Sequence, residues 1–435
     1  MSSAIEKTSP GLLTPTMSRA IGDQLGDPDW MAALRSRAAS VAASLRWPTT
    51  MERPWKYLDV SALDLDALTP AVAATSKGSP DAIGSRYSLA DHRGSLLVQS
   101  NGETVLAESR DGAAVVDFVA ARGEHAATVR ANLATAVPVD RSRFTALHYA
   151  FLRGGVLVAV PANAEPGPVR IVRDLEQGEQ FAAPHTLVVT GPNSRVSVID
   201  EYRSGDGELV VVPAVELIPG PGATIRYTQI HRWGAATRVF GEQRAITATD
   251  SSVVSMSVVV GGSVVKFHIE SSLAGRGSSS QLFGLGVGTG HEHVDFFTLQ
   301  DHIAPDTRSD LLFKSALRDH ARSVYYGLTR VGLGARNADA NQESRNLLLS
   351  RNAKADSDPV LEILTNDIVR ASHGATAGPV DEEQLFYLQA RGLRRPEAEA
   401  LLVRGFLAEA LDRVDAPALR DELSAIIEDR LEQAE

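Results

Sequence analysis

The stretch from Val253 to Ile269, VVSMSVVVGGSVVKFHI, carries the pattern that decides the fold. Two short runs rich in β-branched residues flank the turn signal Gly261–Gly262, and neither run shows the three-to-four spacing of a helix. Val258–Val260 is apolar on both faces of a strand, whereas a sheet with one solvated face alternates polar and apolar residues. The stretch therefore predicts strands that are buried on both sides.

The same texture extends from Phe144 to about Thr365. Short runs of Val, Ile and Thr recur between clusters of Gly, Pro, Ser, Asn and Asp, and no helical stripe separates them. The missing crossover helices argue against a doubly wound sheet. Many short strands indicate a β-solenoid or a large β-sandwich, and both stay open because no clean repeat is visible. Expected strands are Val156–Val160, Thr186–Val189, Val196–Ile199, Thr224–Ile230, Val253–Val260, Val264–Ile269, Val294–Leu299 and Ser323–Val331.

Helical periodicity returns after Asp381, near the C-terminal end of the chain. Asp381 and the acidic residues after it suit the first turn of a helix, where they interact favourably with its dipole. Gly392 is a stop signal, and Pro396 and Pro417 suit the starts of two further helices. The sequence thus predicts three C-terminal helices.

The N-terminal part is helical or mixed. Apolar residues recur at spacings of three and four from about Ser18 to Arg46, and Thr69–Pro80 has the composition of a loop. We therefore divide the chain into a helical or mixed region at 1–143, a β core at 144–370 and a helical C-terminal domain at 371–435.

Composition restricts the classes of function. The chain has 435 residues, a formal net charge of -11 and no cysteine. An acidic protein repels phosphate backbones, which argues against nucleic-acid binding. The lack of cysteine excludes a thiol nucleophile, a disulfide framework and an all-cysteine metal site. No apolar run approaches the roughly 18 residues of a membrane span and no secretory signal is visible, so we expect a cytoplasmic protein.

Nucleotide-binding motifs are missing. The segment Gly284–Gly290, GLGVGTG, does not satisfy G-x-G-x-x-G in any register, and no P-loop motif occurs. We interpret this segment as a glycine-rich turn between strands. If ATP drives the process in which this chain acts, another chain hydrolyses it.

Two groups of histidines are candidate metal ligands. His291, His293 and Asp295 would share one face of a strand, with His302 nearby, and imidazole with carboxylate suits Zn or Fe(II). Without an assured fourth ligand, the simpler interpretation is a polar strand face hydrogen-bonded to its neighbours. His373 lies among small residues where the β region gives way to helices, and a lone histidine is most often structural.

Several motifs together resemble the SufB/SufD family of the SUF iron–sulfur cluster assembly machinery. The resemblance spans nearly the whole chain, and its motifs are specific as a set although each is weak alone. They are Pro54–Tyr57, Phe144–Phe151, His302, Ala304–Pro305, Ser309, Lys314, Ala321, Tyr326–Gly327, Ala340, Gln342, Arg345–Ser350, Ser372–Thr376, Asp381–Leu388 and Arg391–Gly392.

The resemblance implies a right-handed parallel β-helix core with a helical N-terminal region and a C-terminal helical domain, which favours the solenoid over the sandwich. It also implies a non-catalytic scaffold in a complex with a SufB-type scaffold and two copies of the SufC-type ABC ATPase. The chain resembles the SufD branch, because SufB-type chains carry a cysteine for sulfur and cluster. Flavin binding and a homodimer in isolation stay open.

The resemblance implies site residues as well. His373 aligns with the SufD histidine thought to lie at the cluster site, so it is the expected iron ligand for a transient cluster shared with the partner scaffold. Many relatives have a cysteine where Ala371 stands, which argues against a thiol contribution from this chain. The family's C-terminal helices bind the ATPase. The expected partner-binding residues are Leu385, Phe386, Leu401, Phe406 and Leu407.

A carbohydrate-active enzyme is the alternative, because β-solenoids often carry acidic clefts that cleave polysaccharides. Such an enzyme would use paired carboxylates. The missing export signal and the family resemblance argue against it, and a structural homodimer that needs no ATPase is a third possibility. The candidate carboxylates are Asp295, Asp301, Asp306 and Asp310.

Overall fold

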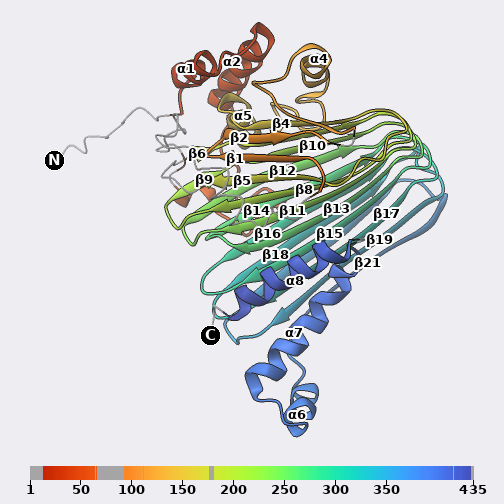
Figure 1. The fold of residues 1–435 in the computed structure, drawn as a ribbon. Coiled ribbons are helices and arrows are strands. Elements are labelled where there is room, and N and C mark those ends of the chain that lie inside the picture. The colour runs from red at the N-terminus through yellow and green to blue at the C-terminus, as the bar shows by residue number, and fades with distance from the viewer. Residues whose placement is uncertain are drawn as a thin grey trace, which may run out of the picture.

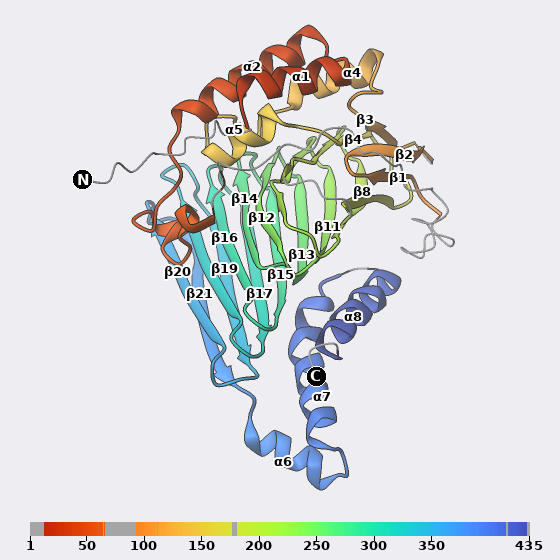
Figure 2. The same ribbon diagram turned by 90° about the vertical axis from the view of Figure 1, so that its left-hand side faces the viewer.

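A computed structural model describes residues 13–63, 65, 93–110, 112–175, 181–414 and 416–432. Within these ranges the chain forms a β-solenoid of about eight turns, with helices at both ends of the sequence (Figures 1 and 2). The predicted mainly β fold with a solenoid core is therefore confirmed. The loop expected at Thr69–Pro80 lies outside the described residues.

Two long sheets make up the solenoid. Sheet I contains, in order across the sheet, β2 (Glu103–Glu108), β1 (Leu96–Ser100), β5 (Val169–Leu175), β8 (Arg195–Ser204), β11 (Thr224–Trp233), β13 (Ser252–Gly261), β15 (Ser279–Gly288), β17 (Arg308–Leu317), β19 (Ala338–Leu348) and β21 (Ile368–Pro379). Sheet II contains β20 (Lys354–Ile363), β18 (Arg322–Val331), β16 (His293–His302), β14 (Val264–Leu273), β12 (Thr237–Ile246), β10 (Ala214–Pro219), β7 (His185–Thr190), β4 (Gly155–Val160) and β3 (Ala114–Asp117), with β6 (Phe181–Ala182) and β9 (Leu209–Val211) beside β12.

The chain alternates between the two sheets, so each coil adds one strand to each. Neighbouring strands pair in parallel along the solenoid, and antiparallel pairing occurs at its N-terminal end, between β1 and β2 and between β3 and β4. Parallel strands require a return through other structure, and here the opposite sheet provides it without crossover helices.

Unequal coil lengths explain why no repeat is visible in the sequence. Thr224 pairs with Ser252, Ser252 with Ser279, and Ser279 with Arg308, so these coils are 28, 27 and 29 residues long. The next coil, from Arg308 to Asp339, has 31 residues. A fixed period cannot fit such spacings, although the strand register is continuous.

The central strands β13 and β15 of sheet I are buried on both faces along most of their length. In β13, Val253 and Val259 contribute to apolar clusters between the sheets, while Met256, Val258 and Val260 pack outward against the C-terminal helices. This double burial gives the continuous apolar run that marks the strand in the sequence.

The glycine-rich segment is mostly strand, so its interpretation as a turn was wrong. β15 continues to Gly288, and only Gly290, with φ of 58°, lies in the turn that follows. A Cβ atom on Gly284 would lie 2.2 Å from the ring of Phe313. Glycine here makes room for a large aromatic side chain from the next coil.

The N-terminal helices cover one end of the solenoid. The pattern at Ser18–Arg46 contains two helices, α1 (Pro15–Leu25) and α2 (Asp29–Ser44), because Gly26 ends α1 with φ of 68°. α4 (Gly123–Asn132) and α5 (Arg143–Ala150) lie beside them (Figure 2). Two short 3-10 turns, η1 (Arg53–Trp55) and η2 (Val60–Leu63), follow α2.

Three C-terminal helices occur as predicted: α6 (Glu382–Ala390), α7 (Arg395–Leu411) and α8 (Pro417–Glu432). α7 and α8 lie along the outer face of sheet I, and α6 projects beyond the last coil (Figures 1 and 2). None of the helices in the described part of the chain is both long and apolar enough to cross a membrane.

His231 is a buried histidine inside the solenoid. Its ring lies 5.0 Å from Tyr202, 5.5 Å from Trp233 and 4.5 Å from Phe267, measured between ring centroids. Neither ring nitrogen has a hydrogen-bond partner among the described residues, and burial lowers the pKa of His231 from 6.5 to about 3. The folded protein therefore holds this imidazole in the neutral form.

We predict that His231 makes the protein acid-sensitive. A histidine whose pKa is lowered on folding contributes stability above its unfolded pKa, and that contribution is lost as the pH falls from 6.5 towards 3. Between pH 7 and pH 5 the loss from this one group is about 2 kcal/mol. In urea denaturation at both pH values, His231→Phe should reduce the pH-dependent loss of unfolding free energy by that amount. An unchanged loss in the variant would contradict the prediction, whatever its baseline stability.

Candidate functional site

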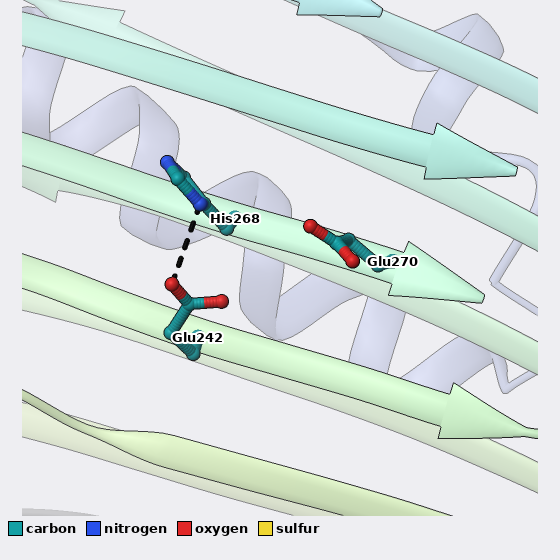
Figure 3. Close-up of side chains that lie close together, drawn as sticks. All are labelled: Glu242, His268 and Glu270. Carbon is teal, nitrogen blue, oxygen red and sulfur yellow. Dashed lines mark ion pairs between the residues drawn. The ribbon is translucent and has the colours of Figure 1, made fainter. Parts of the chain in front are cut away.

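A cluster of charged side chains lies on the outer face of sheet II. In the parallel pairing of β12 with β14, Glu242 is next to His268 and Arg244 is next to Glu270. Alternate residues of a strand share one face, so all four side chains point outward. Figure 3 shows His268 directed towards Glu242, with Nδ1 3.3 Å from the carboxylate oxygen.

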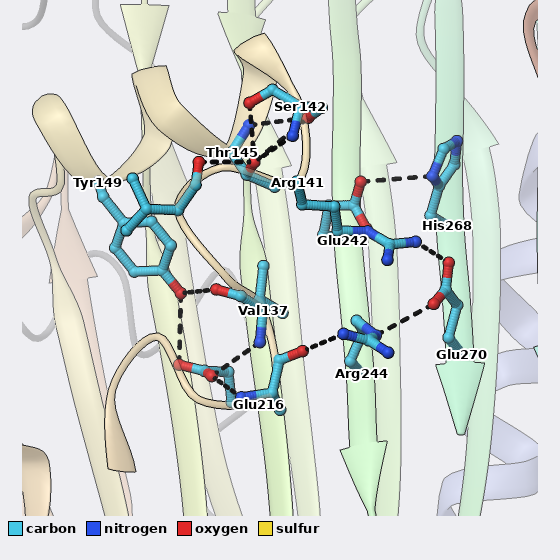
Figure 4. Close-up of polar contacts among 12 residues, drawn as sticks. Val137, Arg141, Ser142, Thr145, Tyr149, Glu216, Glu242, Arg244, His268 and Glu270 are labelled. Carbon is cyan, nitrogen blue, oxygen red and sulfur yellow. Dashed lines mark hydrogen bonds and ion pairs between the residues drawn. The ribbon is translucent and has the colours of Figure 1, made fainter. Parts of the chain in front are cut away.

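Arg141, from the segment before α5, lies across this cluster (Figure 4). Its Nε donates to Glu242 at 3.1 Å and its Nη2 donates to Glu270. Arg244 Nε lies 3.0 Å from the other oxygen of Glu270. Two carboxylates thus share two guanidinium groups and an imidazole.

The two glutamates respond differently to the same surroundings. Burial opposes ionisation of Glu242, but His268 and Arg141 outweigh burial and lower the pKa of Glu242 to about 2. Burial raises the pKa of Glu270, despite the attraction of Arg141. Glu242 is therefore the firmly ionised member of the pair, and His268 faces a permanent negative charge.

This cluster is not a metal centre as it stands. Glu242, His268 and Glu270 each offer a ligand atom within 4.8 Å of the others, which is a spacing that an ion could use. Arg141 and Arg244 already balance both carboxylates, and a divalent ion would add two uncompensated charges to a buried site. We interpret the cluster as an ionic clamp that holds Arg141 on sheet II.

Glu216 forms a second clamp beside the first (Figure 4). Its buried carboxylate accepts backbone N–H groups from Ala134 at 2.8 Å, Ala136 at 2.7 Å and Val137 at 2.9 Å. The hydroxyl of Tyr149 also donates to it, at 3.4 Å. The segment that leads into α5 is therefore fixed to sheet II by hydrogen bonds to a charged group, which are the stronger kind.

The predicted cluster around His291 is only partly assembled. His293 Nε2 lies 3.8 Å from Asp295, but Asp295 pairs with Lys266 at 2.8 Å. His291 lies before β16, in the turn, and stacks on His320. The interpretation of these residues as a polar, hydrogen-bonded strand face fits this arrangement better than a metal site.

His302 points the other way, into the solenoid. Its two ring nitrogens lie 2.8 Å from Thr307 and 2.9 Å from Ser309, and burial lowers its pKa to about 4. His302 is therefore a neutral structural histidine.

The four candidate carboxylates of the alternative enzyme do not form a catalytic pair. They lie on β16, on β17 and in a turn, and each has a positively charged partner. The pairs are Asp295 with Lys266, Asp301 with Arg330, Asp306 with Arg276 and Asp310 with Arg413.

His373 lies on the last coil of the solenoid. It is in β21, next to Gln342 of β19, and its side chain is exposed. Within the described ranges β21 pairs only with β19, and β20 pairs only with β18. The last coil thus presents two long strand edges beside an accessible imidazole.

The five predicted partner-binding residues divide by exposure. Leu385 and Leu407 are buried in the C-terminal domain, and Phe406 packs against the apolar cluster under α7. Phe386 is 72% exposed and Leu401 is 47% exposed. The sequence pattern missed Tyr387, which is 58% exposed beside Phe386.

An ionic anchor holds α7 on the solenoid. The ammonium group of Lys314, on β17, donates to Glu409 at 2.5 Å and to the carbonyl oxygen of Phe406 at 2.6 Å. Arg345, on β19, donates to the same oxygen of Glu409 at 2.9 Å. Lys314 and Glu409 therefore link α7 to the last coils, and Lys314 lowers the pKa of Glu409.

The sequence profile of the family described as "SUF system FeS cluster assembly, SufBD core domain" matches residues 173–406. The chain therefore belongs to this family of iron–sulfur cluster assembly proteins. It is 26% identical to the iron–sulfur cluster assembly protein SufD of Bacillus subtilis, over 94% of this chain and 96% of that protein.

Other members of the family are more similar over shorter lengths. An iron–sulfur cluster assembly SufBD family protein of Mycobacterium leprae is 32% identical over 60% of this chain and 71% of its own length. SufD of Escherichia coli is 32% identical over 44% of this chain and 45% of its own length. The predicted resemblance to the SufB/SufD family is confirmed.

We predict that Arg141→Met destabilises the fold. The change leaves Glu242 and Glu270 buried with one guanidinium group fewer, and removing one partner of a buried ion pair is costly. Because the side chain of Arg141 is 25% exposed, we expect a loss of about 2–3 kcal/mol, below the usual range for fully buried pairs. Urea denaturation measures the loss.

The matched control is Arg122→Met, because Arg122 is exposed and, within the described part of the chain, donates to the nearby carbonyl groups of Val119 and Ala121. Adding Glu270→Gln to Arg141→Met should restore part of the stability, since it removes a carboxylate that has lost its partner. Equal stability of the wild type and Arg141→Met would contradict the clamp.

Proposed function

We propose that this chain is a non-catalytic scaffold subunit for iron–sulfur cluster assembly. It would pair with a SufB-type scaffold through the last coil and bind the SufC-type ATPase through its C-terminal helices. The observation that supports this proposal best is the open last coil, in which β20 and β21 each have one edge without a partner among the described residues and β21 carries His373. Membership of the SufBD family supports a role in iron–sulfur cluster assembly.

The strand edges of β20 and β21 favour a protein partner. An exposed edge offers a row of unsatisfied N–H and C=O groups, which a second β structure can complete. Apolar side chains are exposed at the adjoining corner, at Leu364 and Val369. A partner with the same solenoid architecture could cover both features together.

His373 suits a role as an iron ligand at such an interface. A neutral imidazole is a competent ligand for iron, while soft thiolates and sulfide hold a cluster. This chain has no cysteine, so the partner scaffold would supply the thiolate and sulfur. The cluster is then a transient cargo shared between two chains, and flavin is not needed for this role.

α6 and the start of α7 favour ATPase docking. Phe386 and Tyr387 are exposed on α6, which projects from the solenoid, and Leu401 is exposed on α7 (Figure 2). Leu385 and Leu407 are buried, so in this conformation they support the helices rather than contact a partner. ATP hydrolysis would take place on the partner chain.

The ionic anchor of α7 would connect a movement of the C-terminal helices to the proposed cluster site. Glu409 contacts Arg345 on β19, and β19 pairs directly with the strand that carries His373. A displacement of α7 by the ATPase would therefore act on the last coil. Coupled movements of this kind need packed elements with two arrangements.

We predict that His373→Ala leaves the complex intact but lowers its cluster content. The side chain is exposed and carries no core packing, so assembly should not change. Iron affinity should fall by roughly tenfold, because mutation of even a residue that hydrogen-bonds to a metal ligand lowers metal affinity by about that factor. Iron and sulfide analysis of the anaerobically purified complex measures the change. His291→Ala, at an exposed histidine far along the chain, is the control, and equal iron and sulfide in both variants would refute the ligand role.

We predict that Phe386→Ser with Leu401→Ser weakens ATPase binding by about tenfold or more, since exposed aromatic and aliphatic anchors dominate interfaces. Titration calorimetry with the purified ATPase measures the affinity. Leu333→Ser is the matched control, because Leu333 is 79% exposed on a solenoid turn. Point variants are preferable to deletion of the helices, which would uncover the apolar outer face of sheet I. Unchanged affinity in the double variant would exclude this docking surface.

A further inference from the structure

Three buried side chains form a relay that joins α5 to sheet II. His148 lies on α5, His185 on β7 and Glu216 on β10, and none of the three is more than 1% exposed. His148 Nε2 lies 2.9 Å from His185 Nδ1, and His185 Nε2 lies 3.2 Å from a carboxylate oxygen of Glu216. At the other end, His148 Nδ1 lies 2.7 Å from the carbonyl oxygen of Val212. The two imidazoles therefore stand between an acceptor at each end.

The three contacts of the relay need more hydrogens than two neutral imidazoles carry. A carbonyl oxygen only accepts, so His148 Nδ1 carries a hydrogen, and a second hydrogen must lie between the two rings. His185 Nε2 has no well-aligned hydrogen bond within the described residues, and a lone pair there would repel the carboxylate at 3.2 Å. Nε2 therefore carries a third hydrogen. Because neutral rings carry one hydrogen each, the relay holds one extra proton.

The extra proton belongs on His185. The carboxylate of Glu216 accepts three backbone N–H groups from the segment before α5, and such donors favour its ionised form. Burial lowers the pKa of His148 well below its usual range, so this ring stays neutral. The buried carboxylate thus faces a protonated imidazole, and the two charges balance each other.

The other charged groups around the relay have partners of their own. Arg173 donates to the carbonyl oxygen of His185 at 3.0 Å, and Arg35 approaches the relay from α2. Burial raises the pKa of Tyr149 well above its usual range, so the hydroxyl that faces Glu216 stays neutral. The surrounding ion pairs are Arg173 with Asp200, Arg35 with Asp27, and Glu242 with Arg141 and His268.

We propose that this relay is a proton-dependent lock that holds α5, and the segment before it, on sheet II. With the proton in place, His185 and Glu216 form a neutral pair. Loss of the proton leaves a buried carboxylate without a counter-charge, which is costly, and opening of the segment relieves that cost by exposing the carboxylate to water. The lock goes beyond the scaffold role and does not depend on it.

The direction of the pH effect follows from the proton count. The closed relay binds one proton that the histidines of the open form release above their ordinary pKa of about 6.5. A state that binds an additional proton loses stability as the pH rises. Each pH unit above that value therefore favours opening about tenfold, until the closed relay itself loses the proton. The effect is opposite in sign to that of His231, which acts at lower pH.

Hydrogen exchange of the full chain tests the lock, because exchange reports local opening. After correction for the intrinsic effect of pH, exchange at residues 134–150 should rise about tenfold per pH unit between pH 7 and pH 9. Glu216→Gln removes the need for the extra proton, since its amide can donate to His185. This variant should open more readily at pH 7 and lose the tenfold dependence. Glu201→Gln, at a buried glutamate of sheet I that pairs with Arg170, is the matched control and should keep it.

NMR of ¹⁵N-histidine-labelled protein counts the hydrogens directly and does not depend on opening. At pH 8 the two relay rings, assigned through their mutual contact, should together carry three N-bound hydrogens, and Glu216→Gln should leave two. The wild-type measurements decide the matter if the variant folds poorly. The proposal is overturned if the wild-type rings carry only two hydrogens, if corrected exchange at residues 134–150 does not change with pH, or if Glu216→Gln keeps the tenfold dependence. Because no partner protein is present, these outcomes are independent of the scaffold role.

Discussion

The parallel hydrogen-bond ladder is the constraint on which the structure depends. Every strand within the solenoid needs a neighbour on each edge and a covering layer on each face. The opposite sheet covers one face of each strand, and the two ends of the chain cover parts of the other. β20 and β21 are the last strands of the two sheets. Each of them therefore has one edge without a partner among the described residues.

The two ends of the chain cover the sheets through both polar and apolar contacts. On sheet II, Arg141 pairs with Glu242 and Glu270, and Glu216 accepts backbone N–H groups from the segment before α5. On sheet I, an apolar cluster lies under α7 and α8. Ion pairs of Lys314 with Glu409 and of Arg170 with Glu422 join the same two helices to the strands. Both ends of the chain are thus held by directional polar contacts as well as by apolar packing.

Much of the fold could be predicted from local sequence. The apolar run at Val253–Val260 identified a doubly buried strand, and proline and glycine signals placed α6, α7 and α8. The choice of a solenoid could not come from periodicity, since the coils differ in length. It came from the family resemblance. Gly284 was misread because glycine in a strand, beside the ring of Phe313, has the same local signature as a turn.

The ionic clamp was harder to predict than the fold. Glu242 and Arg244 alternate on β12, and His268 and Glu270 alternate on β14, so each strand hints at a charged outer face. Their pairing requires the register between two coils, and Arg141 comes from a distant segment. The exposure of Phe386 and the burial of Leu385 also follow from tertiary packing, which helical periodicity on its own did not separate.

The variable coils have a consequence for divergence within the family. β11 and β13 to β18 are all ten residues long, while the spacing between paired strands of successive coils ranges from 26 to 32 residues. The differences in length therefore fall in the corners, where insertions and deletions leave the strand register intact. Related chains can remodel these corners without changing the stacked core. Two duplicated copies of such a gene can acquire different surfaces while keeping the same stacked core.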